Sequence, residues 1–288
     1  ITLTNNTDIQ VGVGTNGDVF LDHSANICGN IRKGVGKEVT FGHSSGQCSG
    51  YGVTEGNMVL PEVSTFMPTT IATLNSNNRL AKCISTNNPS ECEKDTYSNK
   101  RETTVPWDPT TRTITTEKNS SLSLGGGDYW VCRLVMGQNS ELVMTAGAKV
   151  RLFFDTPENC GIPSGGSQVE LSNHATISAT GYNADLGNFD VPGLYLMGST
   201  TRPTVANWSN NTETSELVFY APHTHIVIDN KATYVGILAG QTVTLGNHAV
   251  VKQDPGFKPP QIGGATIYQR QSYVECTGAS ASPPNADC

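Results

Sequence analysis

Few residues of this chain have the types and spacing that catalysis requires. Asp155 and Glu158 flank one loop, and Asp185 and Asp190 share another. Two neighbouring carboxylates can act as acid and base in the cleavage of a glycosidic bond. A catalytic groove running over repeated units would, however, need aspartates that recur on one face at one fixed interval, and none do. We therefore assign these carboxylates to loops and turns and predict no catalytic residue.

The histidines are the candidates for metal ligation. His223 and His225 alternate along one strand-like segment and so point to the same side, and His23 and His43 occupy equivalent positions of a nine-residue repeat. Stacked imidazoles could bind a metal ion if a third ligand converged on them, but the sequence indicates no such ligand. The glycine-rich stretch 125–128 is a single loop without the calcium-binding nonapeptide. We predict no metal and no cofactor.

Eight cysteines without any Cys-x-x-Cys spacing indicate disulfides rather than a metal centre. An even number of cysteines is typical of a protein that folds in an oxidising compartment. Sequence alone does not fix the connectivity, and we predict sequential pairing. The predicted bridges are Cys28–Cys48 (one repeat apart), Cys83–Cys92 (a small loop), Cys276–Cys288 (the tail) and, by elimination, Cys132–Cys160.

Composition and charge exclude some partners. Only 15% of the residues are charged, the net charge is −7, and lysine and arginine are scattered. This argues against a nucleic-acid footprint and against a patch for anionic membranes. No stretch approaches the ~20 apolar residues that span a bilayer, and no signal peptide is present, so we interpret Ile1 as a mature or trimmed start. Possible glycosylation sequons, which support export, occur at Asn5, Asn119, Asn207 and Asn210.

One nine-residue pattern, apolar–x–apolar–x–(Asn or His)–x–small–x–apolar, recurs along the chain. Alternating apolar and polar residues put the apolar side chains on one face of a short strand. The fifth residue is in most copies an Asn or a His, which tolerate left-handed backbone angles, so we predict a bend there. Clear copies begin at Ile1, Val19, Val169, Ile226 and Val243, and looser copies begin at Val39 and Leu134.

Adjacent copies begin about 17 to 20 residues apart, which matches one coil of a parallel β-solenoid. We predict an all-β fold, a right-handed parallel β-helix (solenoid) with a loop-rich insertion and disulfides. Equivalent fifth residues would stack in a ladder and share side-chain hydrogen bonds. A β-sandwich with Asn-containing turns is the alternative. The predicted ladder consists of Asn5, His23, His43, Asn173, Asn230 and Asn247.

The pattern divides the chain into four parts. We predict N-terminal coils over residues 1–63 and an insertion over 64–118 that packs along the side of the solenoid. The coils then continue over residues 119–251, and the tail, 252–288, carries one strand at 265–276. Prolines and charged residues interrupt the repeat within the insertion, which is why we separate it from the coils.

Several segments beside copies of the pattern resemble a known family. They are Tyr129–Val131, Val150–Asp155, Leu217–Pro222 and Tyr234–Ala239. With the repeats, they are similar to the extracellular β-helical region of pilin-like proteins from bacterial type IV pilus assembly clusters. The resemblance covers roughly residues 1–63 and 120–251. In that family a hydrophobic N-terminal helix precedes the solenoid, so we expect that this helix was removed here or that another export route is used.

The regularities of the chain serve stacking, and none converges on a reaction. We therefore expect an extracellular or cell-surface structural protein, a pilus- or filament-associated subunit whose partners are copies of itself or other subunits, with no nucleic acid and no membrane span in this chain. Because the pattern begins at Ile1 without a polar cap, we expect an open strand edge there and assembly through it. The alternatives are a polysaccharide-binding adhesin that contacts surface glycans and a polysaccharide-degrading β-helix enzyme.

Overall fold

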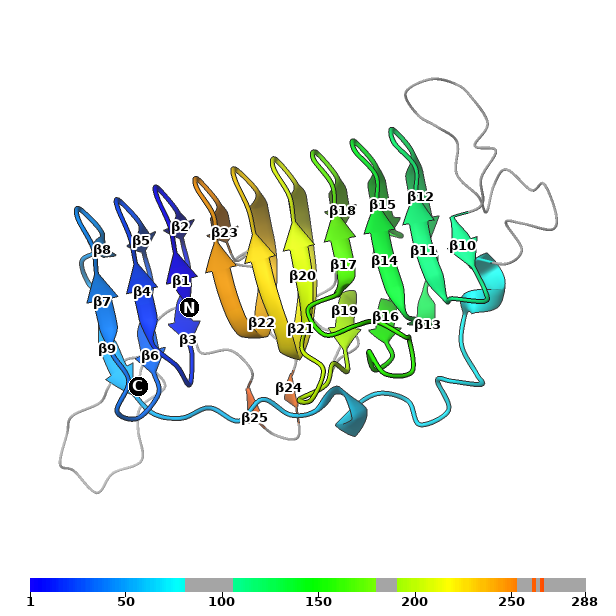
Figure 1. The fold of residues 1–288 in the computed structure, drawn as a ribbon, viewed down its shortest axis with the longest axis horizontal. Coiled ribbons are helices and arrows are strands. Elements are labelled where there is room, and N and C mark those ends of the chain that lie inside the picture. The colour runs from blue at the N-terminus through cyan, green and yellow to red at the C-terminus, as the bar shows by residue number, and fades with distance from the viewer. Residues whose placement is uncertain (81–105, 180–190, 253–260, 263–264, 267–288) are drawn as a thin grey trace.

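The chain forms a long stack of short coils (Figure 1). The structure is a computed structural model that describes residues 1–80, 106–179, 191–252, 261–262 and 265–266. In these ranges the protein is nearly all β, and twenty strands belong to one large sheet. Almost every pairing is parallel and joins strands of neighbouring coils. The β-sandwich alternative is therefore wrong, because equivalent residues lie over one another in successive coils instead of being split between two facing sheets.

Each coil contributes strands to three faces. The first face holds, in spatial order, β7 (Val39–Phe41), β4 (Val19–Leu21), β1 (Thr2–Leu3), the ends of β22 (Thr233–Leu245) and β21 (Glu213–Ile228), β20 (Thr204–Trp208), β17 (Ser167–Leu171), β14 (Arg133–Met136) and β11 (Thr113–Thr116). The second face holds β8 (Gly46–Gln47), β5 (Asn26–Ile27), β2 (Asp8–Ile9), β23 (Val250–Lys252), the starts of β22 and β21, β18 (Thr176–Ser178), β15 (Glu141–Met144) and β12 (Ser121–Leu124).

The third face is divided into two parts. One part pairs β13 (Gly127–Val131), β16 (Val150–Phe154), β19 (Gly193–Leu196) and the middles of β21 and β22. The other is a separate sheet of β3 (Val13–Gly14), β6 (Ile31–Lys33) and β9 (Val53–Glu55). Outside these faces lie β10 (Trp107–Asp108), antiparallel to β11, the 3-10 turn η1 (Val63–Thr65), a helical turn at 77–80, and an antiparallel pair of β24 (Gln261–Ile262) and β25 (Ala265–Thr266).

The order of the coils in space differs from their order in the sequence. Strand β1 lies between two others, with Thr2 opposite Thr244 of β22 on one side and Phe20 of β4 on the other. The expectation of an open edge at Ile1 is therefore wrong. The chain winds outward from β1 to β9, crosses along the side of the stack, and winds back from β10 until its last coil meets the first (Figure 1).

Every copy of the pattern turns at its sixth residue rather than at its fifth. The sixth residues have left-handed angles, with φ between 54° and 60°. The N–H of the seventh residue donates to the C=O of the fourth, as from Ala25 to Asp22 over 3.2 Å. This closes a four-residue turn whose third residue needs positive φ, so the bend is displaced by one residue from the prediction. The left-handed turn residues are Asn6, Ser24, Ser44, Asn119, Asn139, His174, Asn211, Lys231 and His248.

A backbone ladder runs along this corner of the stack. The N–H of each sixth residue donates to the C=O of the fifth residue in the next coil, for example from Lys231 to Asn247 (2.9 Å) and from His248 to Asn5 (3.0 Å). The predicted ladder residues therefore do lie over one another. Side-chain amide bonds at the corner run through sixth residues, from Asn139 Nδ2 to Asn119 Oδ1 (2.9 Å) and from Asn211 Nδ2 to Asn173 Oδ1 (3.3 Å).

The apolar positions of the pattern fill the interior of the stack. Leu3, Leu21 and Leu245, which are register partners in adjacent coils, are fully buried. Small seventh residues such as Ala25 and Ala249 are buried beside them. Like residues thus pack on like residues, and each coil depends on its two neighbours to cover its apolar face.

The crossing segment, residues 59–80 of the described chain, packs on the outer surface of the third face. Val63 and Ile71 are buried there against aromatic side chains of the strands, including Phe153 and Tyr220. Strands β16 and β19 are buried on both of their faces as a result, which is the usual state of parallel strands with a covering layer. The predicted side packing of the insertion is thus seen for residues 64–80, and residues 81–105 lie outside the described ranges.

Two further sequence predictions concern the point where the coils resume and the strand in the tail. The coils resume with β11 at Thr113, inside the range assigned to the insertion. Of the strand expected at 265–276, only Ala265–Thr266 falls within the described residues, as β25. No helix in the described ranges is long and apolar enough to cross a membrane.

Candidate functional site

One end of the stack is an open coil, residues 39–55. Its strands β7, β8 and β9 pair with β4, β5 and β6 on one side, and within the described ranges no strand pairs with their other side. Such an edge presents unpaired backbone N–H and C=O groups that can hydrogen-bond to another chain. The coil is held to its neighbour by backbone bonds such as Gly42 N–H to Leu21 C=O (2.7 Å).

The open coil also exposes apolar side chains from positions that are buried elsewhere. Phe41 is the register partner of the fully buried Leu21, yet 44% of Phe41 is exposed. Val53 is opposite the fully buried Ile31 and is 43% exposed. Tyr51, in the turn before β9, is 41% exposed. Within the described residues, no further coil lies over this end of the stack.

A disulfide and an ion pair hold the open coil in place. Cys48 is bonded to Cys28 of the neighbouring coil, which confirms that predicted bridge. Lys33 Nζ lies 2.5 Å from Glu55 Oε2, and the Gly36 N–H donates to Glu55 Oε1. The hydrogen bond from Lys33, and then that from Gly36, lowers the pKa of Glu55.

The opposite end of the stack is covered. Strand β10 pairs antiparallel with β11, and Trp107 of β10 is buried in the main core together with Leu80. Asn77 is hydrogen-bonded to both backbone groups of Trp130 in β13, with its Nδ2 donating to the C=O (2.6 Å) and its Oδ1 accepting from the N–H (3.0 Å). Ile114, an apolar position of the first coil at this end, is fully buried.

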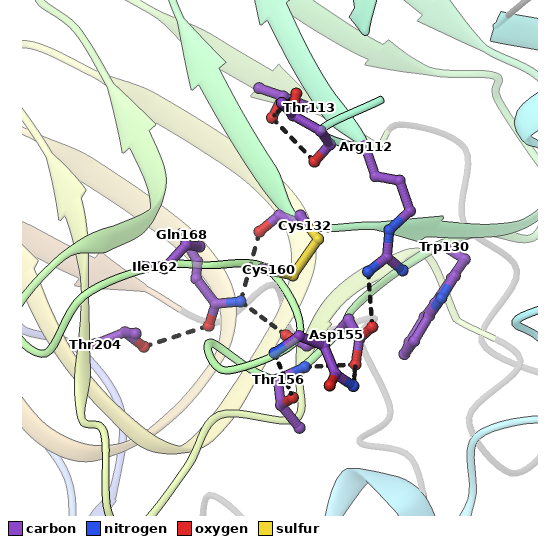
Figure 2. The surroundings of a disulfide bond; sticks show 12 residues. Arg112, Thr113, Trp130, Cys132, Asp155, Thr156, Cys160, Ile162, Gln168 and Thr204 are labelled. Carbon is purple, nitrogen blue, oxygen red and sulfur yellow. Dashed lines mark hydrogen bonds and ion pairs between the residues drawn. A yellow bond between two sulfur atoms is a disulfide. The ribbon is translucent and has the colours of Figure 1, made fainter. Parts of the chain in front are cut away.

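The carboxylate Asp155 serves the second disulfide loop rather than an open site (Figure 2). Its Oδ2 accepts from Arg112 Nη2 (2.8 Å), and its Oδ1 accepts from the Thr156 N–H (2.7 Å) and from Asn159 Nδ2 (3.0 Å). Both oxygens of this buried carboxylate are thus engaged in fixing the turn. Arg112 also lies over the ring of Trp130, with its Cζ 5.4 Å from the ring centroid.

The loop that Asp155 fixes is closed by the Cys132–Cys160 disulfide, which confirms a second predicted bridge. The other two predicted bridges, Cys83–Cys92 and Cys276–Cys288, and the carboxylates Asp185 and Asp190 lie outside the described residues.

Gln168 is a buried polar residue that sequence reasoning did not select. Its Nε2 donates to the C=O of Asp155 (2.9 Å) and, more weakly, to the C=O of Cys132 (3.5 Å), and its Oε1 accepts from Thr204 Oγ1 (3.3 Å) (Figure 2). Thr204 is in turn bonded to Thr224 one coil further on. Gln168 occupies an inward position of the stack, where pairing by side-chain and backbone groups makes a buried amide tolerable.

Glu158 lines a small polar pocket of about 350 Å³ with Glu62, His223 and Ser199. Ser199 Oγ donates to Glu158 Oε1 over 2.6 Å, and this bond is the main cause of the lowered pKa of Glu158. His223 Nε2 lies 2.8 Å from Glu62 Oε2, which joins the crossing segment to β21. Asp155, the expected partner of Glu158 in any acid–base pair, does not line this pocket.

The histidines do not converge on one point. The rings of His23 and His43 lie one coil apart with centroids 5.7 Å from each other, and His23 Nδ1 contacts Asp22. His225 is bonded to Thr242, and burial lowers its pKa. Among the described residues, no group of three His, Cys, Asp or Glu side chains could hold a metal ion.

The glycosylation candidates lie at different depths. Asn5 and Asn210 are exposed at the turn corner, whereas Asn119 and Asn207 are half-buried. Asn119 also accepts the side-chain bond from Asn139. Asn5 and Asn210 are therefore the two sequons whose side-chain amides are most accessible to a modifying enzyme.

Comparison with known protein families, with curated proteins and with solved structures gives no match for this chain.

Proposed function

We propose that this chain is an extracellular structural protein, a pilus- or filament-associated subunit that assembles through its open coil. The proposal includes a right-handed winding of the parallel β-helix and residence in an oxidising compartment. The two disulfides in the described part of the chain are compatible with such a compartment. The partner is another subunit of the same assembly, which contributes a β-edge of its own.

The observation that carries this proposal is the open coil. Strand edges without a partner in the described part of the chain and partly exposed core positions occur together there, on β7 and β9. Soluble repeat proteins normally end in a polar cap over such a surface, and a strand edge without one pairs readily with another chain. A partner that adds a strand to β7 would satisfy the backbone edge and bury Phe41 at the same time.

The test is to make the open coil polar without touching the interior. Phe41→Ser and Val53→Lys remove apolar surface and place a charge at the edge, and sedimentation velocity and negative-stain microscopy over a range of concentrations then report assembly. We expect both variants to remain folded monomers under conditions in which the unmodified chain associates. Leu74→Ser is the matched control, since Leu74 is an exposed apolar residue of the crossing segment. Equal association of all three variants and the unmodified chain would overturn the proposal.

A second candidate, a polysaccharide-binding adhesin, draws on the polar pocket. Its lining combines the carboxylates of Glu62 and Glu158 with the hydroxyls of Ser199 and Thr200, which are groups that hydrogen-bond to sugars. Glycan-array binding by the unmodified chain that is lost in Glu158→Ala and kept in Phe41→Ser would favour this candidate. No glycan binding above background would exclude it.

A further inference from the structure

The described chain consists of two bodies that meet at one junction. The N-terminal block, residues 1–58, contains three coils, and the main stack contains the coils from β10 to β23. At the junction, β1 and β2 of the block pair with β22 and β23 of the main stack. The backbone bonds across it include Thr4 N–H to Leu245 C=O (2.9 Å) and Asp8 N–H to Ala249 C=O (3.0 Å).

No covalent bond of the block crosses this junction. The block contains two cysteines, Cys28 and Cys48, and they are bonded to each other. The block is therefore held to the main stack by the backbone ladder, by apolar packing around Leu3 and Leu245, and by the connecting segment. All of these contacts except the connection could be made equally well by the block of another molecule.

The connection has a short hinge. Arg32 and Val35 of the block are hydrogen-bonded to Asn57, and Asn16 is hydrogen-bonded to Met58, so the chain is tied to the block as far as Met58. From residue 61 onward the chain is tied to the main stack, where Tyr220 Oη donates to the C=O of Pro61 (2.6 Å) and His223 pairs with Glu62.

Only Val59 and Leu60 lie between these two sets of bonds. Val59 is 89% exposed and packs on neither body. Leu60 packs partly on the outer cluster of the main stack. Once the junction bonds are broken, a change of backbone angles at these two residues would let the block move away from its own main stack without breaking hydrogen bonds inside either body. Such hinges are the usual sites at which identical elements exchange between protomers.

We infer that the N-terminal block exchanges between two copies of this chain, so that β1 of one copy pairs with β22 of the other. The exchanged junction has the same partners and the same register as the junction within one chain. Two extended residues span only about 7 Å, so the exchanging molecules lie side by side and a reciprocal, closed dimer forms. This inference is independent of the proposed assembly through the open coil, which lies at the other end of the block.

Cross-linking between two single-cysteine variants tests the exchange. Thr2→Cys and Thr244→Cys place thiols at facing positions of the junction, and a short bismaleimide joins them without disturbing the native disulfides. The two variants are unfolded together in urea without reductant, refolded as a mixture and cross-linked. We expect a covalent heterodimer on denaturing gels, in about half of the exchanged dimers if copies pair at random.

Two controls make the outcome decisive. Thr40→Cys mixed with Thr244→Cys measures random collision, because in an exchanged dimer these positions are three strand spacings apart, about 14 Å, beyond the reach of a short bismaleimide. The double variant Thr2→Cys/Thr244→Cys, cross-linked within one chain and carrying Phe41→Ser to block assembly at the open coil, should remain monomeric after refolding at any concentration. A heterodimer yield no higher than that of the Thr40 control would overturn the inference. Repeating the test on Phe41→Ser separates it from assembly at the open coil, since exchange should survive that substitution.

Discussion

The two ends of the stack are built from the same repeat but are finished differently. At one end the strand β10 and the buried residues Trp107 and Leu80 close the core. At the other end the coil 39–55 leaves Phe41 and Val53 partly exposed, and no strand of the described ranges pairs with its outer edge. A repeat protein hides its core only where something lies over the last coil, and this difference between the ends is what supports the proposed association through the open coil.

A one-ended surface has a definite consequence for assembly. A subunit with two open ends would extend into a fibre, whereas a subunit with one open end forms a pair or terminates a larger structure. The covered end owes its closure to residues that belong to no copy of the pattern, such as Asn77 and Trp107. The difference between the two ends can therefore be tested by substituting residues at each of them.

The largest effect is expected from Trp107→Ala at the covered end. Removal of this buried ring from the core should lower the free energy of unfolding by about 3–5 kcal/mol and expose Ile114, which gives the stack a second open end. Phe41→Ala should cost less than about 1 kcal/mol, because the side chain is already half exposed. Urea titration measures both values, and light scattering should show larger particles for Trp107→Ala alone. Similar losses of stability in the two variants would mean that the ends are equally buried in solution.

The two disulfides should differ in what they stabilise. Each closes a loop of similar length, with sequence separations of 20 and 28 residues, and loops of this size are worth about 3 kcal/mol in the chain-entropy account. Cys132 and Cys160 belong to the main stack, so Cys132→Ser/Cys160→Ser should lower the global free energy of unfolding by about 3 kcal/mol. Cys28→Ser/Cys48→Ser should instead release the open coil.

Amide hydrogen exchange resolves the two cases. Without the Cys28–Cys48 bond, residues 39–55 should lose protection while the interior coils keep it. If protection fell uniformly over the whole stack, the open coil would unfold only together with its neighbours, and the contrast between the ends would be weaker than we describe.

Glycine at the sixth residue of the turn should stabilise the coils by a smaller amount. Ser24 and Ser44 have φ of 55° and 57°, and glycine reaches such angles without steric cost. Ser24→Gly, in a coil with two neighbours, should raise the global free energy of unfolding by about 0.5 kcal/mol. Ser44→Gly should raise only the exchange protection of the open coil. Ser172→Gly, at a fourth residue without positive φ, serves as the control and should be slightly destabilising.

The smallest expected effect is a dependence of the stability of the open coil on pH. The pKa of Glu55 is lowered by its bond from Lys33, so its stabilisation is present above the ordinary glutamate value of 4.5 and is lost as the pH falls through the lowered value. Hydrogen exchange of residues 39–55 should accelerate over that interval, and Glu55→Gln should remove the dependence. At the covered end the pKa of Asp108 is likewise lowered, by the Thr111 hydroxyl. Its protonation should not open β10, because Trp107 remains buried.

Much of the local structure was predictable from the sequence, because it is set within single coils. The alternation at Val19–Leu21 predicted a strand with inward Leu21, and the spacing of Cys28 and Cys48 predicted a bond between adjacent coils; the structure confirms both. The bend was misplaced by one residue. The sixth position carries Ser, His and Lys as well as Asn, so residue type gave no clear signal there.

The order of the coils was not predictable in the same way. All copies of the pattern present similar apolar faces, so the sequence did not indicate that Leu3 would pack on Leu245. That choice depends on where the crossing segment leads the chain, and this segment has no repeat. For this reason we predicted the open edge at Ile1, whereas the structure has it at residues 39–55. The roles of Trp107 and Gln168 were missed because neither residue belongs to a copy of the pattern.

The position of β1 has a consequence for biosynthesis. Thr4 is bonded to Leu245, 241 residues later in the chain. During translation the first three coils emerge with the apolar face of β1 uncovered, and the strand that covers it is made about 240 residues later. Formation of this late contact closes a very long loop and is expected to be slow. A newly made chain thus depends on protection from neighbouring chains until its final coil has emerged.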